Sequence, residues 1–343
     1  MSKEHPLVSV CIPCFNAEDT IAATLDSILA QTYQNIEIIV SDNQSKDRTK
    51  KIILAYADKG VRLVENPPVE EGGGRIFGAF DNWDYAFSSG KGDFLCLYHA
   101  DDLYEPEIVE KEVNFLLARP ETGAVFTQRK FIDKNNCGIK KKKKFQPINF
   151  KQDREFEFSE FFELLLKRRH FISTPTLMIR KEVIAEVGQF NEKCFATAAD
   201  LDYFLRINMK FKLGIVNEKL HSYRLSENHA TAKIHKMRTS ISDYFVVVAH
   251  YISLIGVKNI STAALDMHEV YLCTDRIRCS FYLMWLEEPD KALEMVKRGL
   301  NWRSLRTIQG WKICFPGVLV YASLVTGLDR IVRSFLNWRF GKK

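Results

Sequence analysis

The most informative part of this sequence begins with the run Ile36-Glu-Ile-Ile-Val-Ser-Asp42-Asn-Gln-Ser-Lys-Asp47. It begins with β-branched residues, stops abruptly at polar ones and leads into a helical pattern, which predicts a strand-to-helix turn. A second apolar run, Phe94-Leu-Cys-Leu-Tyr98, is followed by His99-Ala-Asp101-Asp102, and Pro106 is well placed to begin a helix. This is the same kind of turn, so the sequence repeats one arrangement.

Acids at both turns indicate a shared ligand site. In an open α/β sheet, ligands bind outside the carboxyl ends of strands, so Asp42 and the Asp101–Asp102 pair can converge in space. Two carboxylates in such a place favour a divalent cation and phosphates. Strands alternate with helical stretches up to about Asp133, which predicts a largely parallel sheet covered on both faces.

An ordered set of motifs resembles family 2 glycosyltransferases. The motifs are Val8-Ser-Val-Cys-Ile-Pro13-Cys-Phe-Asn16, Leu25-Asp-Ser-Ile-Leu-Ala-Gln31-Thr-Tyr33, Glu37 to Asp47, Asn82-Trp83, Gly92-Asp-Phe, His99 to Asp102, and Ala199-Asp200-Leu-Asp202-Tyr-Phe-Leu-Arg206. The resemblance covers about residues 6 to 226. It implies the GT-A fold, an α/β fold of nucleotide-diphospho-sugar transferases with a mostly parallel sheet.

The resemblance implies a nucleotide site at the first turn. Asp42 would accept hydrogen bonds from the nucleobase, helped by the backbone around Pro13 and Asn16, and Asn82 would line the same donor site. Taken by itself, Asp42 could instead accept hydrogen bonds within its own turn. Asp47 could contribute to the nucleotide site, but it is better placed to cap the next helix.

The second turn is the expected metal site. Asp102 is the preferred direct ligand of Mn²⁺ or Mg²⁺, with Asp101 assisting or binding the ribose, because a hard cation stabilises the departing nucleoside diphosphate. The alternative is that Asp102 caps the helix ahead of Pro106. His99 stands where many family members carry the first Asp of an Asp-x-Asp pattern, which leaves the full ligand set open.

Asp200 is the expected general base. It would take the proton from an acceptor hydroxyl in a single displacement that inverts the anomeric carbon. The alternative is a capping box in which Thr197 caps a helix and Asp200 lies in its first turn. Many family members have Glu-Asp where this chain has Ala199-Asp200, and Asp202 is the reserve candidate.

A late motif completes the candidate site. The motif His221-Ser-Tyr223-Arg224, with His229 beyond it, lies where related enzymes can contact the diphosphate, although structural packing would also explain these residues. The glycine-rich stretch Gly72 to Gly78 fits neither a dinucleotide fingerprint nor a P-loop, so it is either a loop beside the donor site or a plain surface loop. Lys140 to Lys144 are either a solvated loop or a contact with an anionic surface or phosphorylated acceptor.

The length of the chain and the distribution of its charge indicate its domain organisation and the kind of ligand it binds. A chain of 343 residues with 46% hydrophobic content is long enough for one large core and an appendage, here a catalytic domain over 1–229 and a helical extension over 230–343. The chain carries a net charge of +6 and residues 301–343 carry +7, so the first 300 residues carry −1. The basic character belongs to the tail, which argues against nucleic acid bound by the main domain.

The cysteines and the C-terminal segment predict the cellular location of the protein. Eight cysteines show no regular framework and no apolar signal segment opens the chain, so we expect a reduced, cytoplasmic protein. Cys11 and Cys14 fit small residues in a buried strand better than a redox pair or zinc site. The uncharged stretch 313–328, interrupted by Pro316-Gly317 and flanked by basic residues and tryptophans, fits a helix in a membrane interface. A packing helix or a homodimer contact is the alternative.

The expected activity is therefore transfer of a single sugar from a nucleotide-sugar, with a UDP-sugar as the expected donor and a cell-surface glycan or lipid-linked molecule as the acceptor. A processive synthase is disfavoured because the chain has no Gln-x-x-Arg-Trp motif. A nucleotidyltransferase would share the metal-bound nucleotide, but it typically has a glycine-rich first loop with lysine or arginine, which Ile12 to Asn16 lacks. A sugar-nucleotide-binding scaffold is the non-enzymatic alternative.

Overall fold

The structure is a computed structural model that describes residues 5–66, 78–139, 148, 150–169, 171–225 and 238–327. The chain divides into two compact units. The first comprises Met1–Phe161 with His170–Ser226, and the second comprises Phe162–Arg169 with Glu227–Lys343. Residues 72–77 of the glycine-rich stretch, the Lys140 to Lys144 run and His229 lie outside the described residues.

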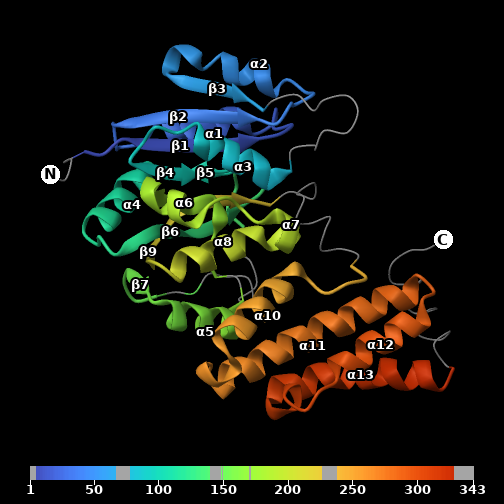
Figure 1. Cartoon of the computed structure of the whole chain (residues 1–343). Helices are drawn as coiled ribbons and strands as arrows, with labels where there is room; N and C mark the ends of the chain where they lie inside the picture. The colour runs from blue at the N-terminus through green and yellow to red at the C-terminus, as the bar shows by residue number, and fades with distance from the viewer. Residues whose placement is uncertain are drawn as a thin grey trace. The chain divides into compact units, whose positions relative to one another are not determined.

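A single mixed sheet organises the described part of the first unit. Its strands are β1 Val8–Cys14, β2 Ile36–Asp42, β3 Val61–Glu65, β4 Phe94–Leu97, β5 Leu103–Tyr104, β6 Thr122–Ile132, β7 Arg154–Phe156, β8 Leu177–Arg180 and β9 Lys212–Arg224. They lie in the order β3-β2-β1-β4-β8-β6-β9-β5, and β7 also pairs with β9 (Figure 1).

Strand direction determines which chain segments meet at the functional edge. The strand β1 runs parallel to β2 and β4, β2 runs parallel to β3, and β6 runs parallel to β9. Between β4 and β6 lies β8, which is antiparallel to both, so β4 and β6 share one direction. The predicted largely parallel α/β sheet is thus confirmed. The carboxyl ends of β1, β2, β4, β6 and β9 and the beginning of β8 therefore lie at one edge.

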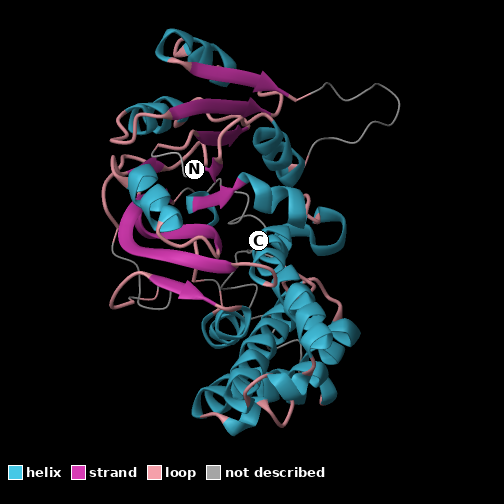
Figure 2. Cartoon of the chain, turned by 60° about the vertical axis from the view of Figure 1, so that its left-hand side comes forward, coloured by secondary structure: helices cyan, strands magenta, loops and turns pink. Residues whose placement is uncertain are grey.

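Helices cover both faces of this sheet (Figure 2). The described helices that lie in or begin in the first unit are α1 Ile21–Leu29, α2 Thr49–Leu54, α3 Ala79–Ser88, α4 Ile108–Leu117, α5 Phe158–Arg168, α6 Lys181–Val187, α7 Glu192–Phe195 and α8 Ala199–Asn208. The described helices α10 Asp243–Ile255, α11 Thr262–Trp285, α12 Pro289–Gly299 and α13 Ile308–Val325 belong to the second unit. Alternate residues of β1, such as Val10 and Ile12, pack in one cluster with α1 and α4, while α3 packs against β1 and β2. Both faces are buried, which explains the nearly continuous apolar runs of these strands.

The cysteines of β1 behave as small buried residues. Cys11 and Cys14 are buried free thiols, and burial raises the pKa of both above the ordinary value. The interpretation of this pair as small residues in a buried strand is confirmed. Asp47 lies one residue before the N-cap position of α2, Arg48, and accepts a hydrogen bond from the N–H of Thr49 at 2.9 Å.

The second unit contains the antiparallel helices α11 and α12 with α13 packed against both. Among the described residues, no helix combines the length and the apolar character needed to cross a bilayer. The predicted interruption at Pro316-Gly317 is wrong, because α13 continues through both residues. Pro316 is exposed, while a Cβ on Gly317 would lie 2.6 Å from Cδ1 of Ile277, so the glycine lets α13 approach α11 closely.

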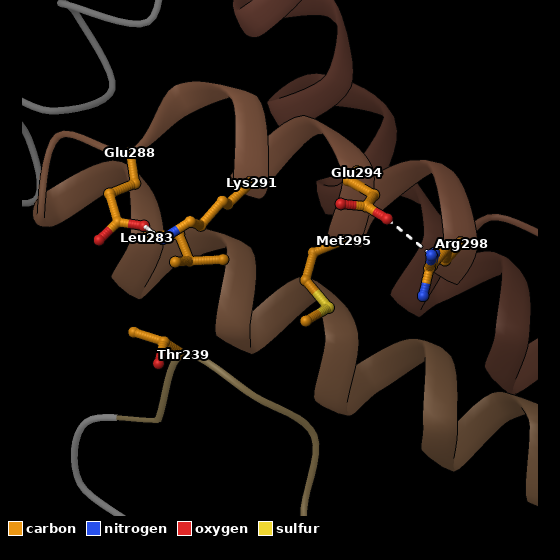
Figure 3. A pocket seen from close by; sticks show the side chains of 7 residues that line it. All are labelled: Thr239, Leu283, Glu288, Lys291, Glu294, Met295 and Arg298. Carbon is orange, nitrogen blue, oxygen red and sulfur yellow. Dashed lines mark ion pairs between the residues drawn. The ribbon is translucent and has the colours of Figure 1, made fainter.

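A hollow of about 230 Å³ lies in this unit, between α11, α12 and Thr239 (Figure 3). Its charged side chains pair with one another: Lys291 lies 2.6 Å from Glu288, and Arg298 lies 2.6 Å from Glu294. None of the residues that the sequence predicts for the functional site lines this hollow. The candidate site must therefore be built at the edge of the sheet.

Gly92 provides a test of this packing. It lies between α3 and β4, its N–H donates to the Ser9 hydroxyl at 2.7 Å, and an added Cβ would lie 2.6–2.7 Å from backbone atoms of Leu7, Ser9 and Phe94. We predict that Gly92→Ala lowers the free energy of unfolding by about 1–3 kcal/mol, because the backbone must shift. In the matched control Gly138→Ala, the added Cβ meets nothing within 4 Å. Equal losses in the two variants, measured by denaturant unfolding, would contradict this packing.

Candidate active site

The end of β2 places Asp42 beside the end of β1, where it pairs in register with Cys14. Its buried carboxylate accepts hydrogen bonds from the N–H of Ser45 at 3.3 Å and from the Ser45 hydroxyl. The Ser45 hydroxyl in turn accepts the N–H of Asn16, whose side-chain oxygen accepts the N–H of Lys46, both at 2.8 Å. The turn hydrogen bonds considered as the alternative for Asp42 are therefore present, and its contact with a nucleobase stays a prediction.

Asn16 has a φ of 47°, a left-handed conformation that asparagine tolerates better than most residues. The side chain is exposed, so this position remains open to a ligand. Pro13, by contrast, is buried within β1, and only its backbone neighbourhood can line a site. These two predicted donor-site positions therefore differ in what they can offer a nucleotide.

Asn82, on α3, is committed to the scaffold. Its side-chain oxygen accepts from the Ser41 hydroxyl at 2.6 Å and from the Asn66 amide at 3.0 Å, and its amide donates to the carbonyl of Cys14 at 3.4 Å. The residue is buried. This network ties α3 to the ends of β1, β2 and β3, so the structure gives Asn82 a supporting position behind the edge. A direct contact with a nucleotide stays a prediction.

The turn after β4 gathers three groups that could hold a metal ion. His99, Asp101 and Asp102 each offer one ligand atom, and these atoms lie within 4.8 Å of one another. His99 and Asp101 are half-buried, whereas Asp102 is fully buried. The N–H of His99 donates to the Tyr104 hydroxyl at 2.6 Å, and the imidazole lies 5.2 Å from the Trp83 ring of α3. The turn is therefore held on two sides.

The carboxylate of Asp102 is enclosed by partners from β9. Nε2 of His221 lies 2.8 Å from one carboxylate oxygen, and the N–H of Arg224 donates to the other at 2.8 Å. Burial alone would raise the pKa of Asp102, but the interaction with His221 and the Arg224 N–H outweigh it and hold the pKa below its ordinary value. The group is thus an ionised, internal carboxylate. It does not cap α4, which begins six residues later at Ile108.

Arg224 extends this enclosure. Its Nε donates to the carbonyl of Asp101 at 2.7 Å, and its Nη1 donates to the carbonyl of Asp133 at 3.1 Å and to Oδ1 of Asn136 at 2.6 Å. The guanidinium therefore clamps the acidic turn to the turn after β6, which is the structural packing considered as the alternative for this motif. A contact of Arg224 with a diphosphate stays a prediction.

Tyr223 precedes Arg224 and is half-buried. Burial, and after it the negative charges of Asp102 and Asp101, raise the pKa of its hydroxyl to about 12. The hydroxyl is therefore neutral at physiological pH and could donate a hydrogen bond to a negatively charged ligand.

A chain of contacts leads from Asp102 to Asp200. Nδ1 of His221 lies 3.4 Å from the hydroxyl of Ser173, and the adjacent Thr174 donates its hydroxyl to a carboxylate oxygen of Asp200 at 2.8 Å. The antiparallel course of β8 explains this arrangement. Because Leu177 at its start pairs with Leu97 at the end of β4, the segment just before β8 lies at the functional edge.

Asp200 is the second residue of α8 and is half-buried. Burial raises the pKa of its carboxyl above the ordinary value, although the Thr174 hydroxyl and the N–H of Leu201 oppose this shift. Helix α8 begins at Ala199 with Ala198 at the N-cap position, so Thr197 does not occupy the N-cap position that the capping-box alternative gave it. The carboxylate is thus more basic than an ordinary aspartate and is held by a hydroxyl.

Asp202 has a different environment. It is buried, and its carboxylate accepts from Nε of Arg206 at 2.8 Å. Arg206 also donates to the carbonyl of Gln189 at 2.8 Å and to the carbonyl of Val187. The reserve candidate is therefore part of an ion pair that anchors α8 to the segment before α7.

Sequence reasoning missed Ser173 and Thr174. The polar stretch Ser173-Thr-Pro-Thr176 before an apolar run is visible as a loop signal, but nothing local says which acid it will contact. It also treated His221 only as part of the late motif, without linking it to Asp102. Both links join segments more than 20 residues apart.

The chain is similar to known glycosyltransferases. The sequence profile of "Glycosyl transferase family 2" matches residues 9–188, more than half of the chain. An uncharacterized glycosyltransferase of Methanocaldococcus jannaschii is 26% identical over 254 residues, which cover 72% of this chain and 80% of that protein. An uncharacterized glycosyltransferase of Rickettsia felis is 32% identical over 208 residues, which cover 59% of this chain. The match spans only 31% of the Rickettsia protein's length.

Two further matches, one by sequence and one by structure, have more specific names. The Escherichia coli protein named "UDP-Glc:alpha-D-GlcNAc-diphosphoundecaprenol beta-1,3-glucosyltransferase WfgD" is 32% identical over 111 residues, which cover 32% of this chain and 41% of that protein. The crystal structure of S. aureus TarS 1-349 in complex with UDP-GlcNAc is 15% identical, with a TM-score of 0.63, and the match covers 94% of this chain and 92% of that one. This structural likeness confirms the GT-A fold. The chain therefore belongs to glycosyl transferase family 2.

Proposed function

We propose that this chain transfers a single sugar from a nucleotide-sugar to an acceptor hydroxyl, with inversion and with the help of a divalent cation. One observation carries the proposal: a single sheet edge holds Asp42, the cluster of His99, Asp101 and Asp102, and, through Ser173 and Thr174, Asp200. A nucleotide acid, a metal-binding group and a base are the three elements that this reaction needs.

The residues present fit a hard cation. Three donor atoms lie within 4.8 Å of one another, and two of them belong to the half-buried His99 and Asp101. We propose that Asp101 contacts the cation directly. Asp102, whose oxygens accept hydrogen bonds from His221 and Arg224, holds the turn that positions Asp101. This exchanges the roles that were expected for the two acids from the sequence. When bound, the cation offsets the negative charge of the departing diphosphate.

Asp200 is the proposed general base. Its raised pKa makes it a better proton acceptor than an ordinary aspartate, and the Thr174 hydroxyl orients one of its oxygens. It takes the proton from the acceptor hydroxyl while that oxygen attacks the anomeric carbon from the face opposite the leaving group. A single displacement of this kind inverts the configuration, and no sugar-enzyme intermediate forms.

The donor and acceptor are proposed by class. The name of the E. coli relative gives UDP-Glc as its donor and a diphosphoundecaprenol-linked sugar as its acceptor, and the TarS protein was crystallised in complex with UDP-GlcNAc. We propose a UDP-sugar donor, with the nucleobase at Asp42, and a glycan or lipid-linked acceptor in cell-surface glycan assembly. Release of a nucleoside diphosphate from a panel of UDP-sugars, with acceptor and Mn²⁺, tests this directly.

The proposed roles predict different effects when each of the two neighbouring acids is substituted. We predict that Asp102→Ala costs about 3 kcal/mol of unfolding free energy, because it leaves the buried groups of His221 and Arg224 without their carboxylate. Asp101→Ala should cost less than about 1 kcal/mol, yet lose Mn²⁺ affinity. Denaturant unfolding and paramagnetic Mn²⁺ titration check the pair. A stable Asp102→Ala that alone loses Mn²⁺ would restore the original assignment.

The general base is tested by Asp200→Asn. We predict a folded variant with near-normal UDP-sugar affinity and about 10²- to 10⁴-fold slower transfer, because the amide keeps the shape but cannot accept the proton. The matched control is Asp202→Asn, on the same helix, which weakens the ion pair with Arg206 but should keep more than about a tenth of wild-type turnover. Wild-type transfer by Asp200→Asn would remove it from the mechanism.

Thr174 is a positioning residue whose removal shifts the pH dependence. Its hydroxyl stabilises the ionised form of Asp200, so Thr174→Val should raise the pKa of that carboxyl further. Less of the base is then ionised at low pH, and the acidic limb of the kcat/KM profile moves to higher pH. Thr174→Ser keeps the donor and should restore the wild-type profile. An acidic limb that Thr174→Val leaves in place would contradict this role.

A further inference from the structure

Helix α13 exposes a row of large apolar side chains. Trp311, Phe315 and Leu319 are 63%, 66% and 56% exposed, and Val318 and Val325 are about half exposed beside them. The spacing of four residues places Trp311, Phe315 and Leu319 along one side of the helix. Burying such side chains is favourable, so a row of them left in water indicates a surface that is covered in use.

The opposite side of α13 already has its partners. Sγ of Cys314 lies 3.7 Å from Sγ of Cys273 on α11, and Gly317 approaches Ile277 of the same helix. Val320 packs in a cluster with residues of α11 and α12. These contacts fix the rotation of α13 within its unit, so the exposed row cannot turn inward without losing them.

Basic residues come before and within the exposed row in the sequence. Arg303 and Arg306, in the turn before α13, are nearly half exposed and lie only loosely against Asp266, at 3.8 and 4.0 Å. Lys312 is exposed within α13. Trp302, 73% exposed, lies beside this group. The remaining chain from 328 to 343 adds five basic residues and one acid.

We propose that this surface, composed of Trp302, Arg303, Arg306, Trp311, Lys312, Phe315 and Leu319, docks on the interface of an anionic lipid bilayer. We call it the α13 surface. Apolar side chains would enter the boundary between headgroups and acyl chains, the tryptophans would lie at headgroup level, and the cations would meet lipid phosphates. The positive balance over residues 301–343 favours lipid over a protein groove, which would need an apolar centre with a matching acidic rim.

The test is co-sedimentation of the full chain with phosphatidylcholine vesicles that contain or lack phosphatidylglycerol, at low and high salt. We expect binding to the anionic vesicles and its weakening by salt. The double variant Phe315→Ser/Leu319→Ser should bind the anionic vesicles at least about tenfold more weakly than wild type. The matched control is Leu254→Ser/Val257→Ser, at positions of the same unit that are 56% and 50% exposed, and it should bind like wild type. Circular dichroism verifies that both variants fold.

Several outcomes would overturn the proposal. Equal binding by the Phe315→Ser/Leu319→Ser variant and the control would show that the α13 surface is not the contact. Equal binding to neutral and anionic vesicles would refute the anionic partner. A dimer that dissociates in the Phe315→Ser/Leu319→Ser variant, with no vesicle binding by wild type, would assign the surface to a second copy of this chain. Because vesicle binding requires no turnover, these results are independent of the proposed transfer reaction.

Discussion

The buried carboxylate of Asp102 is the constraint on which the site depends. A charged group without access to water is tolerated only when hydrogen-bond donors surround it, and here both donors come from β9: the imidazole of His221 and the N–H of Arg224. The end of β9 is thereby tied to the turn after β4. Because the Arg224 guanidinium also binds the Asp101 carbonyl, the same interaction sets the backbone from which Asp101 projects.

Two rigid networks flank the edge of the sheet. On one side, Asn82, Ser41 and Asn66 join α3 to the ends of the first strands. On the other, His221, Ser173 and Thr174 join the acidic turn to Asp200. Groups that must act together on one substrate need supporting residues that hold them in place. Asp102 and Asp200 are held by groups from other parts of the chain, whereas Asp42 is held by Ser45 of its own turn.

The sequence was sufficient to predict the fold and the positions of Asp42, Asp101 and Asp102, because strand-to-helix turns leave a local signal in apolar runs that end at polar residues. The sequence was insufficient to predict how deeply each acid is buried and which residues contact it. That Asp102 is enclosed while Asp101 is half-buried follows from β9, more than 100 residues later, and that Thr174 reaches Asp200 follows from the antiparallel insertion of β8. Pro316 misled the prediction of a break, since its exposed position lets α13 continue past it. These contacts depend on pairing between strands that are distant in sequence, and the periodicity of the sequence does not predict such pairing.

The central claim is that this edge binds a nucleoside diphosphate through a cation. Calorimetric titration of UDP into the full chain, in Mn²⁺ and again in excess chelator, measures it without requiring the acceptor. The account predicts binding that is at least about tenfold tighter with Mn²⁺, because a cation held at the acidic turn would offset the negative charge of the phosphates. Equal affinity with and without the cation, or no binding of UDP in either condition, would contradict it.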